Sequence, residues 1–116
     1  MKIPEIAQAL KAEIFTKNHD EELEIKSACS ADLMSDVMAF SKENAMLLTG
    51  LINPQVVRTA EMMDIKVIVF VRGKKPLESM ISLAEERGIA LIATDYPLFE
   101  ASGLLYMKGI KGSGEN

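Results

Sequence analysis

The sequence predicts a single α/β domain, in which a mainly parallel sheet of about four or five strands lies between layers of helices. Residues 46–64 (MLLTGLINPQVVRTAEMMD) have the pattern of a buried strand, a tight turn and a helix in direct succession. Residues 66–71 (KVIVFV) form a β-branched apolar run, which is typical of a strand buried on both faces of a parallel sheet. Apolar runs and amphipathic segments then alternate, which favours repeated strand–helix units.

The N-terminal quarter has a different pattern. A short helix is predicted over residues 4–12, because Ile3, Ile6 and Leu10 share one helical face. A short strand at 13–16 and an alternating strand at 23–27 follow, and their proximity predicts an antiparallel hairpin.

The remaining elements are predicted from periodicity and from the residues at their ends. Asn53 is a favourable N-cap, and Pro54 is favourable at the first helical position. Gly88 is a natural terminator of the helix before it, and Thr94 and Asp95 are placed to cap the last helix. The order is a helix from residue 30 or 31 to about 41, a strand at 46–48, a helix from 54, a strand at 66–71, a helix from 76, a strand at 89–93 and a helix at about 97–108.

Size and charge restrict the function classes. The chain of 116 residues, 48% apolar and 26% charged, suits one domain over residues 1–109 with a loose tail at 110–116. A net charge of −4 argues against nucleic acid or an anionic membrane as a partner. The single cysteine, Cys29, and the lack of an apolar run of about 20 residues indicate a cytoplasmic protein. Eight methionines favour adaptable surfaces, some of them at a subunit contact.

No catalytic or metal-binding pattern is present. His19 is the only histidine and lies in a charged turn far from Cys29, so a zinc site is not expected. Phosphate-binding loops, nucleophile elbows and dinucleotide fingerprints are also missing. We therefore predict no catalytic residue, no metal and no cofactor. Enzymatic activity is a further hypothesis, which would depend on the carboxylates of Asp32, Asp36 and Asp95 as acid–base groups.

Polar turns follow the predicted strands, and in a parallel sheet these turns meet at one edge, where ligands bind. Free N–H groups at helix starts favour anions there. Capping and turn chemistry offer a structural explanation for the same residues, and a solvated basic turn explains residues 72–75. The candidate ligand-binding residues are Thr49, Gly50, Asn53, Asp32, Ser35 and Arg72.

Several short segments resemble a known family. Residues 31–38 (ADLMSDVM), 53–57 (NPQVV), 99–101 (FEA) and 104–106 (LLY) look like the DRTGG domain, in matching order and spacing from the first helix to residue 109. The sequence departs from the family at residues 24–29 (EIKSAC), where the paired glycines that name it are expected. A role that depends on glycine backbone freedom there is not supported.

The resemblance implies a regulatory or dimerising domain without assigned catalysis. DRTGG domains occur as stand-alone proteins, beside CBS domains in inorganic pyrophosphatases and within phosphate acetyltransferases, and their fold is similar to the N-terminal domain of HPr kinase/phosphorylase. The P-loop kinase half is missing here, so kinase activity is not implied. The leading hypothesis is a non-catalytic regulatory or interaction module that forms a homodimer; the alternative is a sensor of a nucleotide or other anionic metabolite. The sequence does not identify a protein partner.

Overall fold

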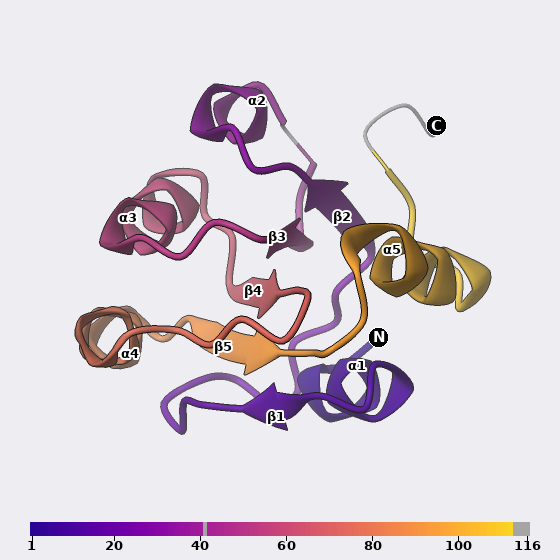
Figure 1. Ribbon diagram of the computed structural model, residues 1–116, viewed down its shortest axis with the longest axis horizontal. Helices are drawn as coiled ribbons and strands as arrows, with labels where there is room; N and C mark the ends of the chain where they lie inside the picture. Colours follow the sequence, from indigo (N-terminus) through magenta and orange to yellow (C-terminus); the bar gives the residue numbers. More distant parts are fainter. Residues whose placement is uncertain (41, 113–116) are drawn as a thin grey trace.

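The computed structural model describes residues 1–40 and 42–112, which form one sheet flanked by helices (Figure 1). Over these residues the sheet has five strands in the order β1-β5-β4-β3-β2. Strands β2, β3, β4 and β5 are parallel to one another, and β1 is antiparallel to β5. The strands are β1 (Glu13–Ile14), β2 (Ser27–Ser30), β3 (Ala45–Thr49), β4 (Val67–Phe70) and β5 (Ala90–Ala93).

Helices cover both faces of the sheet, as Figure 1 shows. They are α1 (Ile3–Ala9), α2 (Met34–Met38), α3 (Pro54–Met62), α4 (Glu78–Arg87) and α5 (Leu98–Met107). Helices α1 and α5 contribute to one apolar core, and α2, α3 and α4 to the other. The predicted three-layer α/β domain with a mainly parallel sheet is therefore confirmed.

The central strands β3 and β4 contribute side chains to both apolar cores. Every residue of both strands is buried. Successive side chains of a strand point to opposite faces. Leu48 and Val69 accordingly pack toward α1 and α5, whereas Leu47 and Ile68 pack toward the other three helices. This arrangement explains why the two segments are continuously apolar in the sequence.

Two of the predicted helix ends are confirmed. Pro54 is the first residue of α3, and Asn53 Oδ1 accepts a hydrogen bond from the Gln55 N–H at 2.8 Å. Gly88 ends α4 in the left-handed region, at a φ of +69°. Helix α4 itself begins at Glu78 rather than at Pro76, because the intervening Leu77 is still extended, with a ψ of 156°.

The predicted cap of the last helix is wrong. Pro97 is the N-cap of α5, and no side chain caps it. The buried Thr94 hydroxyl instead donates to the Leu10 carbonyl at 2.7 Å and accepts from the Tyr96 N–H at 3.3 Å. Thr94 therefore joins the end of β5 to the chain after α1, since its hydroxyl satisfies a buried carbonyl there.

The predicted antiparallel hairpin is also wrong. Strands β1 and β2 lie at opposite edges of the sheet, because β1 pairs with β5 and β2 pairs with β3. The alternation at residues 23–26 correctly indicates one buried side, with Ile25 inside and Lys26 outside, but pairing as a strand starts only at Ser27. The Ile25 N–H donates to the Met1 carbonyl at 2.7 Å instead. The next helix is shorter than predicted from residue 30 or 31 to about 41, since α2 spans Met34–Met38; residue 41 lies outside the described residues.

Residues 110–112, which the sequence places in the tail, lie against β2. Ile110 is buried in the core beneath α5, and Lys111 forms a parallel bridge with Ser27. The Ala28 N–H donates to the Lys111 carbonyl at 2.9 Å, and the Lys111 N–H donates to the Lys26 carbonyl at 3.1 Å. The other tail residues, 113–116, lie outside the described residues.

Candidate functional site

The carboxyl ends of β2 and β3 bring three of the candidate residues into direct contact. Asp32 follows β2, whereas Thr49 ends β3 and Gly50 follows it. Asp32 Oδ1 accepts hydrogen bonds from the Gly50 N–H at 2.7 Å and the Thr49 hydroxyl at 3.1 Å. We call the group of Asp32, Thr49, Gly50 and Arg72 the carboxyl edge. The parallel sheet thus places these distant residues together, as the sequence predicts.

Internal hydrogen bonds account for much of this polarity. The Thr49 side chain is fully buried, and besides its bond to Asp32 it accepts from the Leu51 N–H at 3.1 Å. The Gly50 N–H is likewise used by Asp32. Asp32 therefore stabilises the turn that joins β3 to α3. This agrees with the alternative interpretation, in which these polar residues serve turn and capping chemistry.

Arg72 has an unusual conformation beside this turn. Its φ is +61°, a left-handed value that is costly for a residue with a Cβ atom. The Arg72 N–H donates to the Tyr96 carbonyl at 2.9 Å, and the Gly73 N–H to the Thr94 carbonyl at 3.0 Å. The guanidinium lies over Gly50, where an added Cβ atom would be 2.5 Å from Nη2. In the described part of the chain no carboxylate forms an ion pair with Arg72.

Two candidate residues do not join the carboxyl edge. Asn53 uses its side-chain oxygen as the N-cap of α3. Ser35 is exposed on α2, and no hydrogen bond among the described residues connects its side chain to Asp32. Neither side chain is therefore bonded to the group that Asp32 organises.

We expect Asp32→Ala to lower the free energy of unfolding by about 1–2 kcal/mol. The substitution removes both hydrogen bonds of Asp32 and leaves the buried Thr49 hydroxyl without its acceptor. Urea denaturation measures the loss. The matched control is Asp36→Ala, because Asp36 is a nearby exposed aspartate in α2; a change within about 0.5 kcal/mol is expected there. Equal losses in the two variants would contradict the role of Asp32.

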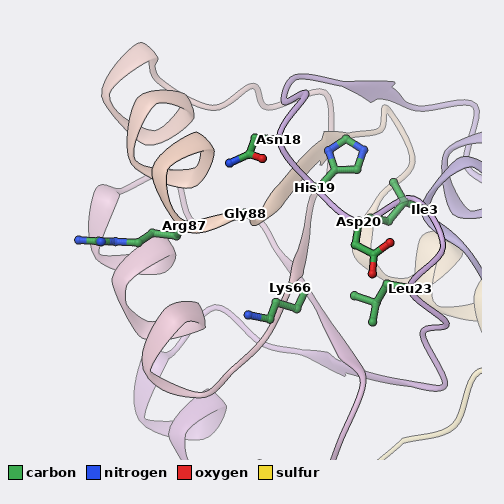
Figure 2. A pocket seen from close by; sticks show the side chains of 8 residues that line it. All are labelled: Ile3, Asn18, His19, Asp20, Leu23, Lys66, Arg87 and Gly88. Carbon is green, nitrogen blue, oxygen red and sulfur yellow. The ribbon is translucent and has the colours of Figure 1, made fainter.

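A cavity of about 280 Å³ lies at the opposite edge of the sheet, where β4 and β5 begin. Figure 2 shows the side chains that surround it. Its lining residues are Ile3, Asn18, His19, Asp20, Leu23, Lys66, Arg87 and Gly88, and we call it the amino-edge cavity. Sequence reasoning missed it, because it assigned His19 to a charged turn, whereas only 4% of that side chain is exposed.

One wall of this cavity is fixed by Glu85 of α4. Its Oε1 accepts from the Lys17 N–H at 2.7 Å and the Asn18 N–H at 2.9 Å. The Asn18 side-chain amide in turn donates to the Glu85 carbonyl at 2.6 Å. The hydrogen bond from the Asn18 N–H, followed by that from Lys17, lowers the pKa of the Glu85 carboxyl below its ordinary value.

Because the pKa of Glu85 is lowered, we expect the hydrogen bonds that join residues 17–18 to α4 to stabilise the fold less in acid than at neutral pH. A carboxyl whose pKa is lower in the folded state stabilises the fold above its unfolded pKa, and this contribution is lost as the pH falls through the folded value. Glu85→Gln keeps an acceptor but does not titrate, so its stability deficit should be larger at neutral pH than in acid. Urea denaturation of both proteins, from neutral pH into the acid range, tests the expectation, with Glu86→Gln as the control. A deficit that is independent of pH would contradict it.

The described residues contain no group of three or more His, Cys, Asp or Glu side chains that could hold a metal ion. Burial raises the pKa of the Cys29 thiol, and the nearby Asp36 carboxylate adds to this shift. A raised pKa lowers the thiolate fraction at neutral pH, so Cys29 is not an activated nucleophile. No helix in the part of the chain that the structure describes has the length and apolarity to cross a bilayer.

The fold and the carboxyl edge define a small α/β module whose polar turn residues mainly hold one another. Comparison with protein families identifies the module more closely: the DRTGG domain matches residues 5–107, and the chain belongs to this family. No curated protein matches the sequence.

A solved structure has a similar fold. The chain is similar to the CBS and DRTGG domains of the regulatory region of Clostridium perfringens pyrophosphatase, with a TM-score of 0.75 and 21% identity. The similarity covers 90% of this chain and 45% of the pyrophosphatase chain. That structure contains the activator diadenosine tetraphosphate. At this identity the likeness establishes a shared fold.

Proposed function

We propose that this protein is a non-catalytic regulatory module that functions as a homodimer, with the outer face of α5 as its interface. The carrying observation is a set of apolar side chains that the protomer leaves exposed: Phe99 and Met107 are each 84% exposed, and Tyr106 is 57% exposed. Together with Gly103 they recur at the spacing of one helical face. We call these four residues the α5 patch.

The composition of α5 supports an interface. In the segment LFEASGLLYM the only charged residue is Glu100, although Ala101 and Leu105 already face the core. A helix that is apolar around its whole circumference is normally buried on all sides. Apart from the chain neighbours of Gly103 and the backbone of α5, no atom of the described residues lies within 4 Å of the position a Cβ would occupy there, so a second helix can approach closely. A two-fold axis through this point would place the same patch on both subunits.

The family assignment supports the regulatory part of the proposal, because the similar pyrophosphatase region is itself regulatory. The single cysteine supports a reducing, cytoplasmic setting. Sedimentation velocity of the full chain at micromolar concentrations tests the dimer. The expected result is a concentration-dependent shift between one and two protomers. A strict monomer at every concentration would contradict the proposal.

A second candidate function is sensing of a nucleotide or other anionic metabolite at the carboxyl edge. It is favoured by the Arg72 guanidinium, which lies over Gly50 without a carboxylate partner among the described residues, and by the start of α3 nearby. The similar pyrophosphatase region was solved with diadenosine tetraphosphate.

Thermal unfolding with diadenosine tetraphosphate, adenosine phosphates and inorganic phosphate tests this second function. A ligand at 100 times its Kd should add about 2.7 kcal/mol to stability. Arg72→Gln should abolish the effect, whereas Arg58→Gln, an exposed change on α3, should preserve it. Unchanged stability with every compound would exclude this function for these ligands.

A further inference from the structure

We propose that the amino-edge cavity binds a small zwitterion of the amino-acid class, with the ligand carboxylate beside Lys66 and the ligand ammonium beside Asp20. The cavity lies at the edge of the sheet opposite Asp32 and Arg72, and it is separate from the α5 patch. The inference is therefore independent of both functions above.

The size and lining of the cavity indicate a small, partly apolar ligand. Its volume of about 280 Å³ is just below the range for drug-sized ligands, which begins at about 300 Å³. Ile3 and Leu23 supply the apolar part of its lining, and the other six lining residues contribute polar side chains or, at Gly88, bare backbone. These proportions suit a free amino acid with an aliphatic or small side chain.

The charges around the cavity are of both signs. Figure 2 shows Asp20 and Lys66 on different sides of the open cavity, with the Arg87 guanidinium directed away from it. Arg87 instead pairs with Glu61 at 2.8 Å. A purely anionic ligand would meet the carboxylate of Asp20, and a purely cationic one would meet Lys66. A zwitterion provides an opposite charge for each.

Both charged groups retain bonding capacity for a ligand. The Lys66 ammonium pairs with Asp64 at 3.2 Å, which leaves two of its three N–H donors available. The Asp20 side chain accepts a hydrogen bond through Oδ1 from the Glu22 N–H at 2.9 Å, so its second oxygen is open to an ammonium. Lys66 is long and about half exposed, so its rotamer can adjust to a ligand.

His19 supplies an independent indication that the cavity is incomplete. Its Nδ1 lies 3.3 Å from the Thr16 hydroxyl, whose oxygen accepts the Leu91 N–H. When the ring proton is on Nε2, Nδ1 can accept the Thr16 hydroxyl proton and Nε2 is a hydrogen-bond donor. Among the described residues, Nε2 is the one buried side-chain nitrogen or oxygen without a hydrogen-bond partner.

A ligand carboxylate can supply the acceptor that His19 lacks. The nearest carboxylate oxygen given by the protein, Glu21 Oε1, is 3.9 Å from Nε2, beyond hydrogen-bond distance. Residues 17–22 are largely exposed, and a small adjustment of this segment would admit a ligand oxygen beside the ring.

The test is an NMR titration of the ¹⁵N-labelled full chain with pools of the twenty free amino acids, followed by single compounds. The expected result is a set of amide shifts confined to residues 17–23, 66 and 87–88. For the best amino acid, the matching amine without a carboxylate and the matching acid without an amine should each bind at least about tenfold more weakly, since each loses a charge-assisted contact.

Variants separate this site from general charge effects. Asp20→Asn and Lys66→Met should each weaken binding about tenfold or more. Asp95→Asn and Lys74→Met make the same changes at the other edge of the sheet and should leave the affinity unchanged. The proposal is overturned if no pool shifts these amides, if the acid alone binds as tightly as the amino acid, or if the control variants lose as much affinity.

Discussion

Replacing Phe99 and Met107 together by glutamate should convert the dimer into a monomer. A two-fold interface would bring four uncompensated carboxylates into an apolar contact, and burying unpaired charges is strongly unfavourable. We expect association to weaken by at least about 100-fold, or about 2.7 kcal/mol. Both side chains are exposed in the protomer, so the fold should persist. Sedimentation equilibrium measures the association, and circular dichroism checks the fold.

The matched control places the same charges on another surface. Met62 and Leu77 are also exposed apolar residues, but they belong to α3 and to the start of α4, on the face of the sheet opposite α5. Met62→Glu with Leu77→Glu should leave the association unchanged. If the α5 double variant still dimerises, or if both double variants dissociate equally, the α5 patch is not the interface.

Phe70→Ala should lower the free energy of unfolding by about 3–5 kcal/mol. Phe70 is the largest of the fully buried side chains and ends β4, with Thr49 and Ala93 beside it in the neighbouring strands. Its removal leaves a cavity directly before the turn that holds Arg72. Urea denaturation at a fixed protein concentration measures the loss.

The same substitution at an exposed phenylalanine is the control. Phe99→Ala removes an equal side chain from the surface of α5, so the protomer itself should lose no more than about 0.5 kcal/mol. Any larger loss should depend on protein concentration, because it would come from the dimer. A Phe70→Ala variant as stable as Phe99→Ala would contradict the position of Phe70 in the core.

The sequence predicts the parts of the fold that depend on local patterns. Strands β3 and β4 are found where continuous apolar runs indicate burial on both faces, and α3 begins at Pro54 because Asn53 satisfies a free N–H. The meeting of Asp32 and Gly50 follows from the parallel order of the strands, which brings their carboxyl ends to one edge.

The pairing of strands that lie far apart in the sequence could not be predicted from local patterns. Alternation at residues 23–26 reveals a buried side but does not identify a partner, and β1 pairs with β5, which is distant in sequence. The amino-edge cavity joins His19 to residues at the starts of two later strands, and no spacing within the sequence marks that grouping. A single histidine forms no sequence motif. The burial of His19 is evident only when the position of residues 17–22 against the rest of the fold is known.

The bridge between Lys111 and Ser27 has a consequence for solubility. An open sheet edge is a template on which another chain can add a strand. At one end of this sheet the edge strand β1 is only two residues long, and at the other end the backbone of Lys111 occupies hydrogen-bonding groups of the β2 segment. A chain cut short before Gly109 would uncover this backbone and the apolar contact of Ile110 together, and so favour edge-to-edge aggregation.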